Sequence, residues 1–215
     1  MSSHSCLFND SALSDQVLIF REQVVHVHRH ILSAHSQHFQ SLWSVESDSS
    51  LDFTFLNVSE ASFISSIQAM YGSQVDVTEI NAYDLFYLAH YFQITCLITL
   101  VEELLIQHFP NWTWIQKFLL RADENQDLNA IKFVGPYFDM VNDIHLEIGL
   151  ALRSDSIKTL TESCLKKLSQ TWLVKSLVVS IKHLIIELSQ FLNIIDLFNF
   201  EVFSFNDWKE LLLSL

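Results

Sequence analysis

The chain has few residues that interrupt regular secondary structure, since only three of its 215 residues are Gly and two are Pro. Half of the residues are hydrophobic, and 17 are Phe. Few breakers combined with many apolar side chains predict a helix-rich globular fold rather than a disordered chain. The shortage of Gly argues against a glycine-rich phosphate loop, and no Gly-x-Ser-x-Gly motif occurs. We therefore predict neither an enzymatic activity nor a bound cofactor.

Basic residues are also scarce, and they are unevenly distributed. The net charge is −13, and the first Lys is Lys117. Residues 1–109 contain 12 acidic and 2 basic side chains, a net charge of −10, whereas residues 110–215 contain 13 acidic and 10 basic ones. Because phosphate contacts require Lys and Arg, we predict no direct nucleic-acid binding. The change in charge predicts a boundary between a domain of residues 10–109 and a second region of residues 110–215.

Cysteines and long apolar runs are few as well. Cys6, Cys96 and Cys164 show no pairing pattern, which favours reduced thiols in an intracellular protein, either cytoplasmic or nuclear. The N-terminus lacks the basic-then-apolar pattern of a signal peptide. The longest apolar stretches, residues 97–106 and 173–188, are too short or too charged to span a bilayer. We therefore predict no membrane association.

The first half changes its hydrophobic periodicity in a way that predicts a hairpin followed by a helix. Apolar residues alternate with polar ones up to Val27, and from Ile31 to Leu42 they recur at helical spacing. A partner strand is predicted over residues 16–20, with a polar turn at residues 21–23. The other predicted elements are a strand over 51–56, an edge strand over 74–77, and helices over 59–72, 81–94 and 96–109. The predicted fold class is α+β, a small three-stranded sheet with flanking helices.

Several short motifs in this half follow one another in a characteristic order. They are Asp15-Gln16-Val17-Leu18, His28-Arg29-His30-Ile31-Leu32 and Ser36-Gln37-His38-Phe39, followed by segments at residues 51–55, 61–72 and 84–92. Through these motifs the chain resembles a BTB/POZ domain over roughly half its length. The resemblance implies the BTB/POZ fold and a role in binding other proteins.

The second half is predicted to be an all-α helical region. Helices are expected over residues 111–120, from Leu128 onward, and over residues 154–168 and 171–192. Gly135-Pro136 is expected to bend or break the helix that starts at Leu128. Helices that follow a BTB/POZ domain resemble the extension called BACK. The apolar residues 191–215 are interpreted either as the final packed helices or as an exposed partner surface.

The resemblance places Asp15 and Arg29 near each other in a charged pocket or interface. We predict a buried or half-buried ion pair, in which loss of one partner would leave the other uncompensated. The alternative is that both are exposed, with a contribution of about 0–1 kcal/mol. Five His residues between positions 26 and 38 raise the alternative of a zinc site. Without a nearby Cys pair or a His-Glu-x-x-His motif we predict no metal, and His28 is interpreted as a packing residue.

The resemblance also implies a function. BTB/POZ proteins dimerise or bind a cullin scaffold as substrate adaptors of a ubiquitin ligase, and cullin-binding members carry an apolar-x-Glu motif after the Ser-x-x-Phe helix. Here Val45-Glu46-Ser47 has Ser in place of the Glu, and Trp43 lies just upstream. We therefore predict Trp43, Val45 and Glu46 as a cullin-contact loop, with a cullin scaffold and a second copy of the chain as partners. The alternative is a homotypic dimerisation scaffold or a transcription-associated protein that recruits corepressors.

Overall fold

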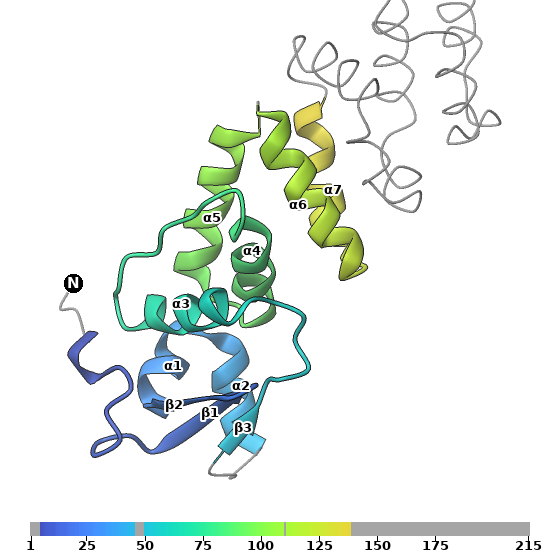
Figure 1. Cartoon of the computed structure of the whole chain (residues 1–215). Helices are drawn as coiled ribbons and strands as arrows, with labels where there is room; N and C mark the ends of the chain where they lie inside the picture. Colours follow the sequence, from blue (N-terminus) through green and yellow to red (C-terminus); the bar gives the residue numbers. More distant parts are fainter. Residues whose placement is uncertain (1–4, 46–49, 110, 139–215) are drawn as a thin grey trace, which may run out of the picture. The chain divides into compact units, whose positions relative to one another are not determined.

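The computed structural model describes residues 5–45, 50–109 and 111–138 (Figure 1). The chain divides into two compact units, Met1–Leu105 and Ile106–Leu215. All of the described strands belong to the first unit.

The first unit contains a sheet of three strands in the order β2-β1-β3. β1 (Gln16–Phe20) and β2 (Gln23–Val27) form an antiparallel hairpin, and β3 (Ser50–Asp52) runs parallel to β1. This sheet confirms the predicted three-stranded fold, although β3 ends at Asp52 rather than at Leu56. The Asp52 carboxylate accepts the backbone N–H of Thr54 at 2.8 Å, and this local turn ends the strand.

The helix predicted from Ile31 to Leu42 is in fact two helices, α1 (Arg29–His35) and α2 (Gln37–Val45). They are separated by Ser36, whose backbone is extended with φ −139° and ψ 117°. The Ser36 hydroxyl donates to the carbonyl of Phe92 and accepts the N–H of Phe39. The prediction of one continuous helix is therefore wrong, because a Ser side chain can replace helical hydrogen bonds and cap a new helix.

The next helices begin close to the predicted positions. α3 (Glu60–Met70) is capped by the Ser59 hydroxyl, which accepts the N–H of Ser62 at 3.2 Å, and Gly72 follows it with a left-handed φ of 82°. α4 (Ala82–Tyr91) and α5 (Thr95–His108) match the two other predicted helices. The edge strand predicted over residues 74–77 is not formed, and these residues pair with no strand of the described sheet. The Asn81 side chain instead binds the Asp76 carbonyl at 2.9 Å and the Thr78 N–H at 2.7 Å, which directs the chain into α4.

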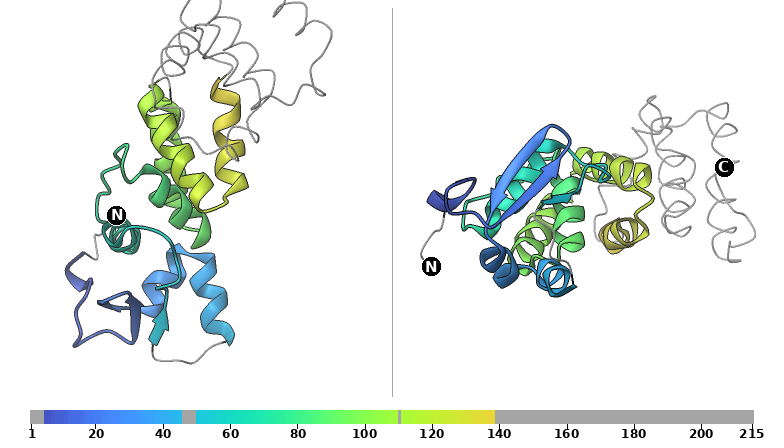
Figure 2. Two further views of the ribbon diagram at one scale, coloured as in Figure 1. Left: turned by 45° about the vertical axis from the view of Figure 1, so that its right-hand side comes forward. Right: turned by 90° about the horizontal axis from the view of Figure 1, so that it is seen from below.

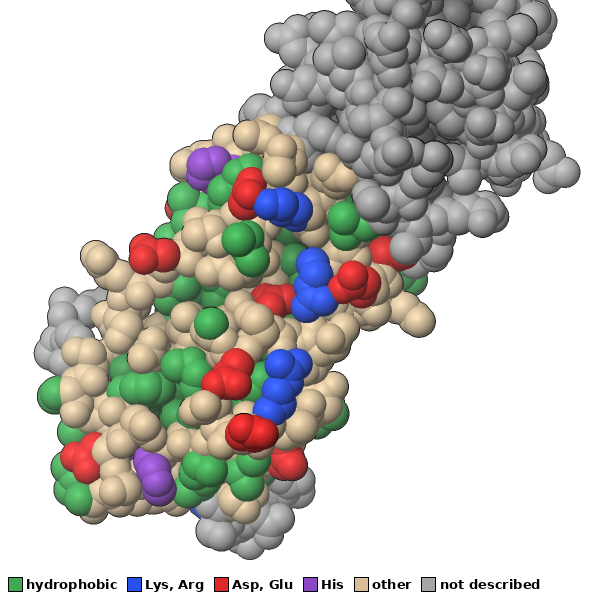
Figure 3. Space-filling view, in the orientation of Figure 1, with side chains coloured by type: hydrophobic (Ala, Val, Ile, Leu, Met, Phe, Trp, Pro, Cys, Tyr) green, Lys and Arg blue, Asp and Glu red, His purple; other side chains and the backbone are tan. Residues whose placement is uncertain are grey.

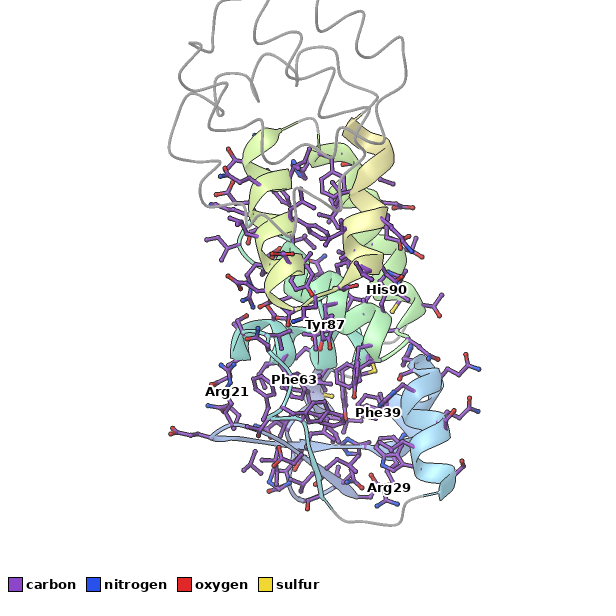
Figure 4. The ribbon with its side chains drawn as sticks, turned by 90° about the vertical axis from the view of Figure 1, so that its right-hand side faces the viewer. Arg21, Arg29, Phe39, Phe63, Tyr87 and His90 are labelled. Carbon is purple, nitrogen blue, oxygen red and sulfur yellow. The ribbon has the colours of Figure 1, made fainter. Side chains whose placement is uncertain are left out.

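Aromatic rings fill the core of the first unit, and Figure 2 shows the β1–β2 hairpin with the helices gathered on one side of it. Phe20 stacks on Phe63 with ring centroids 4.4 Å apart, and Phe39 stacks on Phe92 at 5.0 Å (Figure 4). Phe53 lies within 6.0 Å of Phe39, Phe63 and Phe92. All five rings are at most 5% exposed. Each such burial stabilises the fold by about 1.5–3 kcal/mol, which explains why the sequence is rich in Phe.

The second unit contains α6 (Trp112–Glu124) and α7 (Leu128–Phe138), which pack against each other. The Asn111 side chain caps α6 by accepting the N–H of Thr113 at 2.9 Å. α7 continues through Gly135 and Pro136, so the expected break is not found. Pro136 lies in the last turn, where a missing N–H removes only one helical bond.

The other predictions for the second half fall on residues that the structure does not describe. They are the helices over 154–168 and 171–192, the apolar segment 191–215 and the BACK-like extension as a whole. Within the described ranges, no helix combines the length and the apolar character needed to cross a membrane.

Candidate interaction site

Asp15 and Arg29 lie together where β1 begins and α1 starts. The Asp15 Oδ1 atom accepts the backbone N–H of Arg29 at 2.8 Å, and the Arg29 Nε atom donates to Gln16 Oε1 at the same distance. Asp15 is exposed, Arg29 is half-buried and Gln16 is buried. The Asp15 carboxylate therefore caps the first turn of α1. Asp15 supplies this cap because His28, at the N-cap position, makes no side-chain capping bond.

Arg29 also connects this pocket to Trp43 on α2. The guanidinium carbon lies 5.9 Å from the centroid of the Trp43 ring, a cation–π contact of about 0.5–1 kcal/mol at an exposed site. Trp43 stacks in turn on the buried Phe39, with centroids 5.1 Å apart and planes 20° apart. Arg29, which is labelled in Figure 4, therefore lies close to both Gln16 and Trp43. Trp43 and Val45 were predicted to lie in a loop, whereas the structure places both in the last turns of α2.

Trp43 is only half-buried, but its indole Nε1 atom is enclosed and has no hydrogen-bond partner among the described residues. A buried donor without a partner costs about 1–3 kcal/mol, so a small movement that gave it an acceptor would be favourable. Val45 is the last residue of α2, and the positions of its side chain and of Glu46 lie outside the described residues.

His28 belongs to a buried hydrogen-bond pair that sequence reasoning did not find. Its backbone N–H donates to the Tyr71 hydroxyl at 2.8 Å, and its Nδ1 atom lies 3.1 Å from the same oxygen. Burial raises the pKa of Tyr71 to about 12. The five His residues do not converge, and across residues 5–45, 50–109 and 111–138 no three His, Cys, Asp or Glu side chains are placed to hold a metal.

A cluster of aromatic rings around one exposed residue, Phe55, is the second feature that the sequence did not reveal; Tyr91, Tyr87 and His38 in this cluster are half-buried. Phe55, in the loop after β3, is 69% exposed, and its ring lies 6.4 Å from that of Tyr91 on α4. Tyr91 lies 5.1 Å from His38 on α2 and 6.0 Å from Tyr87 on α4. We call Phe55, Tyr91, Tyr87 and His38 the Phe55 surface. In Figure 3, hydrophobic side chains reach the molecular face over the part that holds the sheet and its helices.

The first unit combines a small three-stranded sheet with flanking helices, and Phe55 is strongly exposed on its surface. The family model for the BTB/POZ domain matches residues 5–109. Among solved structures, the BTB domain of zebrafish PATZ1 is 22% identical, with a TM-score of 0.40, covering 44% of this chain and 76% of that one. No curated protein matches the chain.

Residues 5–109 therefore form a BTB/POZ domain, as the sequence motifs indicate. This fold is a protein–protein interaction and dimerisation module, and it is not typical of enzymes.

Proposed function

We propose that the protein is a substrate adaptor of a cullin-based ubiquitin ligase, and that it contacts the cullin at the C-terminal end of α2. The observation that carries the proposal is the position of Trp43. It is a half-buried indole stacked on a core ring, and it lies two residues before Val45, where the apolar residue of the cullin motif is expected. Trp side chains held on a rigid base are enriched among the residues that dominate binding energy.

The charge of the domain supports a basic partner. Residues 1–109 have a net charge of −10, and their two basic side chains are both engaged within the fold. Arg21 donates to the carbonyl of Val58 at 3.0 Å, and Arg29 donates to Gln16. An acidic surface of this kind accelerates association with a positively charged partner and makes the association sensitive to salt.

The test is a titration of the purified chain with the N-terminal domain of a cullin scaffold. We expect a Trp43→Ala/Val45→Ala double variant to bind about thirtyfold more weakly, which corresponds to the roughly 2 kcal/mol of an interface hot spot. Leu13→Ala is a control, since Leu13 is an apolar residue that is 63% exposed and lies outside α2. Thermal melts of all three proteins separate a binding effect from a folding effect. Equal affinity of the wild type and the double variant would place the contact elsewhere.

The second candidate function is a homotypic scaffold, or a dimer that recruits a corepressor. It is favoured by residues 73–80, where half-buried and exposed side chains alternate as in a strand although no strand pairs with them in the described sheet. A second copy could supply the missing neighbour. Light scattering distinguishes the candidates, because a stable dimer that does not bind cullin supports the scaffold and a cullin complex supports the adaptor.

The adaptor function has a consequence for self-modification. Because no Lys precedes Lys117, self-ubiquitination on Lys must fall at or beyond this residue. Mass spectrometry of a reconstituted ligase reaction tests this position by position.

A further inference from the structure

A cavity of about 370 Å³ lies in the first unit, where α1 ends, α2 begins and α4 turns into α5. Its volume is near the lower end of the range of ligand sites, so it holds a small molecule or a few residues of a peptide. The Phe55 surface contributes no residue to its lining. We call it the glutamine cavity, because three Gln residues line it: Gln37, Gln40 and Gln93.

The backbone that carries these residues is fixed by buried neighbours. Ser36, which separates α1 from α2, is 2% exposed and forms an isolated antiparallel bridge with the fully buried Ile94. The Ser36 hydroxyl also donates to the carbonyl of Phe92. Gln93 lies between Phe92 and Ile94 and has a left-handed φ of 53°. A ligand therefore meets groups whose backbone is already positioned, which lowers the entropy cost of binding.

The glutamine cavity is polar, and none of the described residues that line it is Lys, Arg, Asp or Glu. His35 is the one residue in this lining with an ionisable side chain. A charged ligand group would lie in the cavity without an opposite charge, which is costly. Phosphate-bearing ligands such as nucleotides are disfavoured further, because residues 1–109 carry a net charge of −10. The ligand group that fits is therefore neutral and polar.

The three amide side chains have unused hydrogen-bonding capacity. Gln37, Gln40 and Gln93 are exposed, and none of them forms a side-chain hydrogen bond with another described residue. Each amide carries N–H donors beside a carbonyl acceptor. Ala34 and Ile98 are the apolar members of the described lining. Hydrogen bonding rather than apolar contact therefore decides what binds here.

The geometry of an amide side chain selects its counterpart. It presents one N–H and its C=O side by side, so two such groups pair through two parallel hydrogen bonds. A trans peptide group points its N–H and C=O in opposite directions and makes only one of these bonds with a single amide. A carboxylate of the same shape accepts hydrogen bonds but has no N–H to donate. The counterpart that uses both functions is the primary amide of Asn or Gln.

We propose that the glutamine cavity binds the side-chain amide of an Asn or Gln residue in a segment of a partner protein. The inference goes beyond the adaptor function and does not rest on it. The cullin contact was proposed at Trp43 and Val45, near the C-terminal end of α2, whereas the cavity lies at the N-terminal end, where Gln37 is the first residue.

The probe is the tripeptide acetyl-Ala-Gln-Ala-N-methylamide, titrated into the isotope-labelled full chain and followed by two-dimensional NMR. The peptide with Glu in the centre keeps the shape but loses the donor, and the peptide with Ala in the centre offers the main chain alone. We expect the Gln peptide to bind with a dissociation constant on the order of 1 mM, because the contact is small. The backbone N–H signals of Ser36 and Thr95 should move. The Glu and Ala peptides should bind at least about tenfold more weakly.

Two variants remove amides from the cavity. Gln93→Gly deletes one without backbone strain, because Gly readily adopts the positive φ at this position, so this variant keeps the fold. Gln40→Ala deletes a second. Each should weaken binding of the Gln peptide about tenfold. Gln74→Ala is the matched control, since Gln74 is exposed in the same unit but does not line the cavity, and it should change the affinity less than about twofold.

Each outcome either supports or overturns the inference. Equal affinities for the Gln, Glu and Ala peptides would show that the side-chain amide is not recognised. Binding that both Gln93→Gly and Gln40→Ala leave unchanged would place the peptide elsewhere. No signal change at about 10 mM Gln peptide, roughly ten times the expected dissociation constant, would also overturn it. Cullin binding is measured separately, so none of these results bears on the adaptor function.

Discussion

Replacing Tyr71 by Phe should remove one hydroxyl from the interior of the BTB/POZ domain with almost no change in shape. Tyr71 is 1% exposed, and its oxygen accepts the buried backbone N–H of His28 at 2.8 Å. The variant leaves that N–H, and the Nδ1 atom 3.1 Å from the hydroxyl, without this partner. A buried polar group that loses its hydrogen bond costs about 1–3 kcal/mol, so we expect the free energy of unfolding at pH 7 to fall by this amount.

The same substitution should alter the response to alkaline pH. The pKa of Tyr71 is raised from its ordinary value of 10.0 to about 12, first because burial disfavours the phenolate. The folded state therefore holds this proton more tightly than the unfolded state. The corresponding stability is fully present below pH 10 and is lost as the pH rises from 10 towards 12. A difference of two pKa units corresponds to a loss of about 2–3 kcal/mol in the free energy of unfolding. The Phe variant has no phenol to titrate and therefore does not show this loss.

The assay is denaturant unfolding of the wild type and Tyr71→Phe at intervals from pH 7 to pH 12. Other groups titrate in both proteins and cancel in the difference between the two free energies. We expect the wild type to be more stable at pH 7, and the difference to shrink or reverse above pH 10. A difference that stays constant across this range would contradict the buried Tyr71–His28 pair.

Three further predictions follow from the packing and the backbone. Leu32→Asp or Phe39→Asp should unfold the first unit, because both side chains are fully buried and an unpaired carboxylate there costs several kcal/mol. A cooperative melting curve like that of the wild type would refute this prediction. A fragment of residues 1–109 should express as a folded domain, and a fragment soluble only with residues 110–215 would show that the two share one core. Gln93→Gly should raise the free energy of unfolding by about 0.5–1 kcal/mol, because Gln93 is exposed and has a left-handed φ of 53°; an unchanged or lowered melting temperature would count against this.

Features fixed by local chemistry could be predicted from the sequence. Ser59 and Gly72 bound α3 because a hydroxyl cap and a left-handed glycine act within a few residues. The β1–β2 hairpin was predicted from the strand-like segments on both sides of a polar turn, although this turn is residues 21–22 rather than 21–23. The family resemblance brought Asp15 and Arg29 together, but it did not show that the carboxylate accepts a backbone N–H.

Features that depend on distant partners could not be predicted. Ser36 ends α1 because its hydroxyl donates a hydrogen bond to the carbonyl of Phe92, 56 residues away. The spacing of apolar residues around Ser36 carries no information about this bond. For the same reason the hydrogen bond between the His28 N–H and the Tyr71 hydroxyl could not be predicted, because the two residues are 43 positions apart in the sequence. Phe55 was assigned to a strand by its apolar neighbours, whereas the turn from Asp52 to Thr54 carries it out of the sheet and onto the surface.

Isothermal titration calorimetry of the full chain with a cullin N-terminal domain tests the central claim most directly. We expect a saturable complex of one chain with one cullin, with an affinity that weakens as salt is raised because an acidic domain meets a basic partner. A chain that is folded by its melting curve and yet gives no binding heat at any salt concentration would contradict the adaptor function.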